Sequence, residues 1–176
     1  MAQPKTPSRR LGREQAFQVL YGLDFAPAAT RSELIRAFHE VPSRGDEKNA
    51  PEKIEQETVK KRGKKSEPAP APPPPQPEGF AWELVEGAWM KREELDEHLS
   101  RFTRNWRLER MGKVEITLLR LALYELLFRD DIPPKVTINE AIELSKQFGD
   151  EGSRAFVNGI LDAAVKAVES GELTRS

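Results

Sequence analysis

The chain has no cysteine, and this absence excludes a large part of protein chemistry. Without a thiol, the chain forms no disulfide, no cysteine nucleophile and no cysteine-based zinc site. Histidine is scarce: His39 and His98 lie far apart without the spacing of a metal-binding pair, and we interpret both as exposed helix residues. No nucleophile beside a base and no glycine-rich phosphate loop is recognisable. The sequence therefore predicts a protein that is not an enzyme and holds no cofactor or metal.

Long apolar runs are also missing. No segment approaches the roughly 20 apolar residues that cross a bilayer, and the N-terminus lacks the apolar core of a signal peptide. Basic and acidic residues nearly balance, 28 against 29 in 176 residues. That balance argues against a surface that coats nucleic acid throughout and leaves room for a local basic patch. We expect a soluble cytoplasmic protein with one domain, or two small ones that share a core.

Residues 42–78 differ in composition from the rest of the chain. Charged residues and proline dominate, and the final tract, 68–77, holds half of the chain's 14 prolines. Such a segment cannot bury enough apolar surface to offset the entropy of ordering. We predict a disordered insertion whose end is polyproline II or mobile. Its basic cluster, 60–65, is interpreted as solvated charge or, alternatively, as an auxiliary RNA contact.

The remaining segments show helical patterns. Apolar residues recur at three- and four-residue spacing, and no segment alternates with the two-residue period of a strand. Capping boxes at 30–33 and 137–140 mark two helix starts, and Thr6-Pro7 marks a third. The fold class is therefore all-α, with 114–128 as a central buried helix. The predicted helices are 6–25, 30–41, 80–102, a short turn at 108–111, 114–128, 137–149 and one that starts near 153.

Basic and aromatic residues share one stripe of the first helix. At 100° per residue, Arg10, Arg13, Phe17 and Tyr21 fall within about 80°, beside the apolar face, and Arg9 borders the stripe. Guanidinium groups donate to phosphate in a planar fork, and an aromatic ring can stack on an unpaired base. The stripe fits a site for single-stranded RNA. The alternative is a solvated helix with Phe17 and Tyr21 at the rim of the core.

Several segments together resemble the NusB family. The run Arg9-Arg-Leu-Gly-Arg-Glu-Gln-Ala-Phe-Gln-Val-Leu-Tyr21 is similar to the opening of that family. The most specific matches are Ile138-Asn-Glu-Ala-Ile-Glu-Leu144 and Phe156-Val-Asn-Gly-Ile-Leu-Asp162. Further similar segments are 105–115 and 119–126. The resemblance covers roughly residues 9–38 and 80–168.

The resemblance implies two small helical bundles packed together, before and after about residue 103. The first would comprise 6–41 and 79–103, and the second 104–170. It also implies an RNA-binding transcription antitermination factor. Such a factor binds the boxA element of nascent ribosomal RNA leaders together with NusE, a small-subunit ribosomal protein. The pair joins NusA, NusG and RNA polymerase and tethers RNA to the elongating complex.

The resemblance also implies particular site residues. Arg10, Arg13 and Tyr21 match RNA-contacting positions of the first helix, and Phe156 matches an aromatic near the RNA, although its spacing also fits the core. For the surface that binds NusE, the matching acidic residues are Glu109 and Glu115, of which Glu115 alternatively pairs with Lys113 or Arg110. Gly152 departs from the family, which often has an acidic residue there, so less repulsion of phosphate is expected.

Two other functions fit the same helices. Some ribosomal RNA cytosine methyltransferases carry a NusB-like domain for RNA recognition, but this chain has neither a cysteine nucleophile nor a glycine-rich cofactor loop. The other alternative is a structural helical protein, such as a homodimer, in which the basic stripe is incidental. A homodimer of the free protein could also cover the RNA face.

Overall fold

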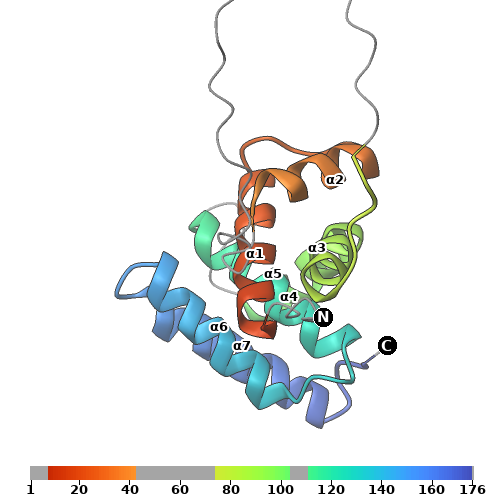
Figure 1. Cartoon of the computed structure of the whole chain (residues 1–176). Coiled ribbons are helices and arrows are strands. Elements are labelled where there is room, and N and C mark those ends of the chain that lie inside the picture. Colours follow the sequence, from red (N-terminus) through yellow and green to blue (C-terminus); the bar gives the residue numbers. More distant parts are fainter. Residues whose placement is uncertain (1–7, 43–73, 104–110, 176) are drawn as a thin grey trace, which may run out of the picture.

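The computed structural model describes residues 8–42, 74–103 and 111–175, and these residues form seven α-helices and no strand (Figure 1). The all-α prediction is confirmed. The predicted turn at 108–111, apart from Met111, and most of the insertion lie outside the described residues. The helices are α1 (Arg9–Leu23), α2 (Arg31–Glu40), α3 (Phe80–Met90), α4 (Arg92–Phe102), α5 (Lys113–Phe128), α6 (Pro134–Phe148) and α7 (Ser153–Glu169).

Helix α5 lies at the centre of the molecule, as its apolar composition predicts. It packs against α1, α3, α4, α6 and α7, and its leucines are almost completely buried. Helices α6 and α7 run side by side along one face, with α1, α2 and α3 on the other (Figure 1). Two packed bundles are therefore present. The division at about residue 103 stays a prediction, because buried side chains from both parts form one core.

Helix α1 begins slightly later than predicted. Ser8 is its cap residue, with an Oγ that accepts a hydrogen bond from the Leu11 N–H at 3.3 Å, whereas Thr6 and Pro7 lie outside the described residues. The capping box of α2 is confirmed. The Thr30 hydroxyl accepts a hydrogen bond from the backbone N–H of Glu33, and the Glu33 carboxylate accepts one from the backbone N–H of Thr30. These caps satisfy N–H groups that the first turn leaves unpaired.

Two other helix boundaries were predicted wrongly. The expected long helix 80–102 is divided at Lys91, which leaves the helical conformation at φ −97° and ψ 11°. Apolar residues keep four-residue spacing on both sides of Lys91, so spacing alone does not reveal the change of direction. Helix α6 starts at Pro134 rather than at Thr137, because a proline suits the first helical position. Thr137 is therefore a buried residue within the first turn, not a cap.

The last residues of the proline-rich tract lie against α2. The Nε2 atom of His39 is 2.8 Å from the carbonyl oxygen of Pro75, and Arg31 Nη1 donates to Gln76 Oε1 at 2.9 Å. Pro77 is buried. The end of the tract is thus held to the fold just before α3 begins, which does not fit the mobile alternative of the two expected for it.

Gly149 ends α6 in a turn that leaves no room for a side chain. A Cβ atom there would lie 2.6 Å from Ser153 Cβ and 2.8 Å from the carbonyl oxygen of Ser145. We expect Gly149→Ala to lower the free energy of unfolding by about 1–3 kcal/mol in urea titrations, because the backbone must shift. The matched control is Gly159→Ala in α7, where a Cβ meets nothing within 4 Å. It should be neutral or stabilising by up to about 1 kcal/mol, and equal effects of the two changes would contradict this account.

Candidate nucleic-acid interface

Two arginines at the start of α1 are open to solvent. The side chains of Arg9 and Arg10 are 55% and 63% exposed. Arg9 pairs with Asp131 at 2.9 Å, and Arg10 pairs with Glu143 at 3.4 Å. Exposed ion pairs of this kind contribute only about 0–1 kcal/mol each. Both guanidinium groups can therefore exchange their carboxylate for a phosphate of a ligand.

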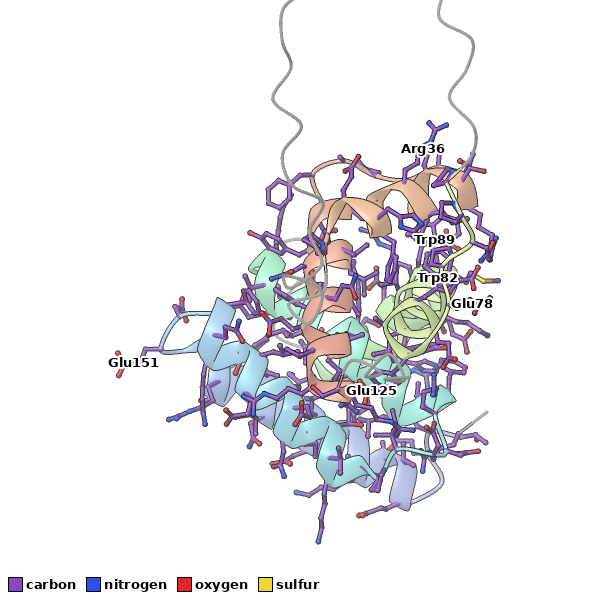
Figure 2. All side chains as sticks on the ribbon, viewed as in Figure 1. Arg36, Glu78, Trp82, Trp89, Glu125 and Glu151 are labelled. Carbon is purple, nitrogen blue, oxygen red and sulfur yellow. The ribbon has the colours of Figure 1, made fainter. Side chains whose placement is uncertain are left out.

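Arg13 is buried, unlike its two neighbours. Its Nε and Nη2 atoms donate to the Glu125 carboxylate at 2.7 and 2.9 Å, and its Nη1 lies 3.9 Å from Glu140. Glu125 also accepts from Thr137 Oγ1 at 3.2 Å, and Figure 2 shows Glu125 inside the body of the molecule. This burial does not fit the expectation that Arg13 contacts RNA from the stripe, because α5 and α6 cover this part of α1. Its role is to fix α1 on those helices.

Four aromatic rings form a row along α1. The ring centroids of Phe148 and Phe17 are 4.6 Å apart, those of Phe17 and Tyr21 5.7 Å, and those of Tyr21 and Phe25 5.2 Å. Exposure rises along the row: Phe17 is buried, Tyr21 is half-buried, and Phe25 is 62% exposed. The row therefore begins at the half-buried Phe148 at the end of α6, passes through the buried Phe17 and reaches the surface just beyond α1.

An open hollow of about 450 Å³ lies between the start of α5 and the start of α7. Of the two neighbouring apolar residues at the start of α7, Val157 faces the core and is buried. Phe156 is half-buried and lies on the wall of the hollow. Glu115 lies on the same wall, whereas Glu109 lies outside the described residues. The structure thus brings Phe156 and Glu115 together. The lining residues are Met111, Gly112, Glu115, Asp150, Gly152, Ser153 and Phe156.

Asp150 fixes the turn at the edge of this hollow. Its Oδ1 accepts hydrogen bonds from the backbone N–H groups of Gly152 and Ser153, both at 2.9 Å, and lies 3.0 Å from Ser153 Oγ. The Ser153 hydroxyl also contacts the Glu115 carboxylate. The pKa of Asp150 is held below its ordinary value of 3.8 by hydrogen bonds to its carboxylate. The largest contribution comes from the Ser153 hydroxyl, followed by the backbone N–H groups of Ser153 and Gly152.

This lowered pKa predicts a pH dependence of stability. A carboxylate whose pKa falls on folding stabilises the protein above its unfolded pKa, and the contribution disappears as pH falls through the folded pKa. We expect Asp150→Ala to reduce stability at neutral pH, and the difference from wild type to shrink below about pH 4. Urea midpoints across a pH series measure this. The control is Glu151→Ala, at an exposed neighbour that points away from the fold (Figure 2); a constant difference for Asp150→Ala would contradict the prediction.

Metal and membrane sites receive no support from the described part of the chain. Residues 8–42, 74–103 and 111–175 contain no group of three or more potential metal ligands among His, Cys, Asp and Glu. No helix within these ranges is long and apolar enough to cross a membrane. His39 is exposed as predicted, whereas His98 is half-buried against the prediction.

Sequence reasoning missed three residues of this surface. Phe148 and Phe25 extend the aromatic row at its two ends, and Lys113 places its Nζ atom 3.9 Å from the centroid of the Phe25 ring. A signal for Phe25 was present in the four-residue spacing of Phe17, Tyr21 and Phe25. Nothing in the sequence indicates that Phe148 and Lys113 meet this row, since both come from distant segments.

Comparison with known proteins identifies the family. The NusB family model matches residues 10–166. The transcription antitermination protein NusB of Nitratidesulfovibrio vulgaris (strain DSM 19637 / Miyazaki F) is 52% identical over 172 residues, covering 98% of this chain and 96% of that protein. The protein of that name in Myxococcus xanthus is 42% identical over 161 residues, covering 92% and 96%.

Solved structures agree with this match. T. maritima NusB aligns with a TM-score of 0.66 at 31% identity, covering 96% of this chain and 99% of that one. A chain from the "Crystal Structure of a Plectonemic RNA Supercoil" aligns with a TM-score of 0.66 at 27% identity, covering 92% and 96%. The helices, their order and the sequence matches together show that the chain belongs to the NusB family of transcription antitermination factors.

Proposed function

We propose that the protein binds the boxA element of nascent ribosomal RNA leaders in the cytoplasm, as a heterodimer with NusE. Together with NusA, NusG and RNA polymerase, it would tether this RNA to the elongating complex. The observation that carries the proposal is the exposed pair Arg9 and Arg10 on the same helix as the aromatic row. Phosphates pair with the guanidinium groups, and unpaired bases stack on the rings.

The geometry of α1 suits an extended single strand. Arg10 and Tyr21 are eleven residues apart, which places them within about 20° of each other around the helix and about 16 Å apart along its axis. Arg10 and Tyr21 therefore lie toward the two ends of one side of α1, and the ring of Phe17 between them is buried. Their separation leaves room for several nucleotides. The buried Arg13 holds α1 against α5 through its ion pair with Glu125.

The hollow suggests where RNA and partner protein meet. Phe156 is the proposed RNA contact from α7, and Glu115, with Glu109, is proposed to face NusE. Because Phe156 and Glu115 line one hollow, RNA and NusE would meet there. Two linked contacts raise the overall affinity above that of either alone. Gly152 adds no carboxylate to this wall, so phosphate meets less repulsion than an acidic residue would cause.

Binding to fluorescently labelled boxA RNA, compared with a scrambled RNA of the same composition, tests the proposal. Anisotropy titrations should show tighter binding of boxA, and NusE should strengthen it further. Two or three neutralised phosphates predict that log affinity falls with log salt at a slope of about −1.4 to −2.1. Equal affinity for the two RNAs, both with and without NusE, would overturn the proposal.

A further inference from the structure

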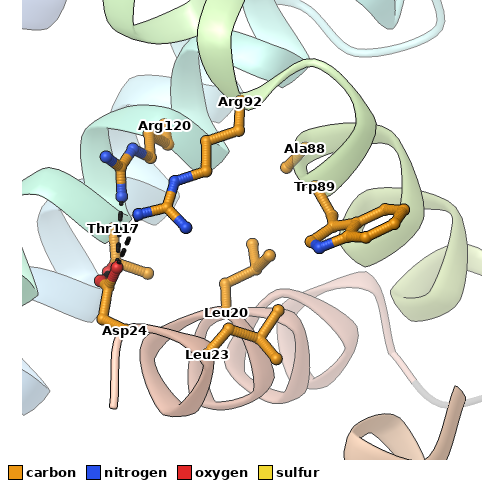
Figure 3. A pocket seen from close by; sticks show the side chains of 8 residues that line it. All are labelled: Leu20, Leu23, Asp24, Ala88, Trp89, Arg92, Thr117 and Arg120. Atoms are coloured by element: carbon orange, nitrogen blue, oxygen red, sulfur yellow. Dashed lines mark hydrogen bonds and ion pairs between the residues drawn. The ribbon is translucent and has the colours of Figure 1, made fainter. Parts of the chain in front are cut away.

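Phe25 is exposed and yet firmly placed. It follows Asp24, whose carboxylate is held by Arg92 at 3.1 Å, by Arg120 at 3.5 Å and by Thr117 Oγ1 at 3.2 Å (Figure 3). These three side chains come from α4 and α5, so the end of α1 is tied to two other helices. A ring on a fixed backbone loses little conformational freedom when a ligand stacks on it. Phe25 is therefore preorganised for such contact.

Lys113 brings a positive charge to this ring. Its Nζ atom lies 3.9 Å from the ring centroid and donates to the carbonyl oxygen of Asp24 at 2.9 Å. Arg9 and Arg10 each have a carboxylate partner, but among the residues that the structure describes none lies within ion-pair distance of Lys113. An ammonium group over one face of an exposed ring, without a carboxylate partner among the described residues, favours a ligand that brings negative charge to the cation and a flat face to the other side of the ring.

Phe25 and Lys113 connect two parts of the proposed RNA surface. On one side, the Phe25 ring is edge-on to the Tyr21 ring at 5.2 Å. On the other, Lys113 follows Gly112, which lines the hollow with Phe156. The two residues thus lie between the stripe on α1 and the hollow, where a continuous strand would pass.

We infer that Phe25 and Lys113 form a further RNA-binding site, in which an unpaired base stacks on the Phe25 ring and Lys113 binds the adjoining phosphate. The inference rests on the proposed function, because it requires RNA to lie along α1. The ligand is assigned to RNA rather than to a protein because the Lys113 ammonium group has no carboxylate partner among the described residues, and because the pair lies beside Tyr21 and the hollow with Phe156. The cavity beside Asp24 (Figure 3) has no part in it: at about 20 Å³, it holds little more than one water molecule.

Substitution of the ring tests the stacking. Phe25→Leu keeps an apolar side chain but removes the aromatic face, and it should weaken binding of boxA RNA by about 5- to 20-fold. Phe25→Trp should restore affinity to within about twofold of wild type, because every aromatic face can stack on a base. Met90→Ala, at a residue that is 70% exposed on α3, is the surface control and should leave affinity unchanged. Thermal melting of each variant establishes that the fold is intact.

A second measurement locates the base. Single abasic nucleotides are placed in turn at each position of boxA, and binding to wild type and to Phe25→Leu is measured. At one position, the abasic nucleotide and Phe25→Leu together should cost less affinity than the sum of their separate effects. Lys113→Gln should reduce the salt slope by about 0.7, the value of one phosphate on a single strand. The inference is overturned if Phe25→Leu binds boxA within twofold of wild type. It is also overturned if the variant binds NusE more weakly and RNA as well as before.

Failure of this inference is distinguishable from failure of the proposed function. If wild type binds boxA and Arg10→Gln weakens that binding while Phe25→Leu does not, the site at Phe25 is rejected and the function stands. If wild type binds boxA no better than scrambled RNA, with and without NusE, both are rejected.

Discussion

Replacing Arg13 by methionine is expected to lower the free energy of unfolding by about 3–5 kcal/mol, because it leaves a buried carboxylate without its cation. The Glu125 side chain is only 2% exposed, so solvent cannot replace the two hydrogen bonds that Arg13 donates. Thr137 would be its remaining hydrogen-bond donor among the described residues. Urea denaturation followed by circular dichroism at neutral pH measures the loss.

A double variant distinguishes the effect of the uncompensated charge on Glu125 from the effect of lost packing around Arg13. Arg13→Met combined with Glu125→Met removes both charges, and it should recover most of the stability lost in the single variant. A loss of less than about 1 kcal/mol for Arg13→Met would mean that the ion pair does not hold α1 in place. This stability effect is also the reason why a charge reversal at Arg13 is a poor test of RNA binding.

Removing the two exposed arginines should have the largest effect on RNA binding. We expect Arg9→Gln combined with Arg10→Gln to weaken binding of boxA by about 10- to 100-fold, because two charge-assisted contacts to phosphate are lost. The salt slope should become shallower by about 1.4. Anisotropy titrations at several salt concentrations measure both quantities.

The controls for this variant concern fold and location. Because the ion pairs of Arg9 and Arg10 are exposed, the free energy of unfolding should change by no more than about 1 kcal/mol. Arg36→Gln removes an exposed charge from the middle of α2 and should leave the affinity unchanged, since Figure 2 shows Arg36 at the top of the molecule, away from α6 and α7. Full retention of affinity in the double variant would remove α1 from the RNA site.

Helix type and order could be predicted from the sequence because they depend on local patterns. The spacing of apolar residues and the capping signals predicted the bounds of α2 and of the central α5 to within one or two residues. Gly149 was correctly predicted to end α6. The break at Lys91 was missed because apolar spacing is preserved across it. Tertiary packing decides such a bend, and periodicity within one segment carries no information about it.

The candidate site was predicted less completely, for a related reason. A helical projection places Arg10 and Arg13 in the same stripe, yet one is exposed and the other is buried. The difference arises from Glu125 and Glu140, which lie more than a hundred residues further along the chain. Lys113 and Phe148 also reach the aromatic row from segments that are far away in the sequence. Local sequence identifies the chemical groups, and long-range packing decides which of them meet.

The most direct test of the central claim is an NMR titration of the isotope-labelled protein with boxA RNA. Shift changes are expected for Arg9 and Arg10 at the start of α1, for Tyr21 and Phe25 at its other end, and for residues around the hollow near Phe156. The buried Arg13 should report only small changes. Changes confined to α2 and α3, or none at saturating RNA, would contradict the claim that this surface binds RNA.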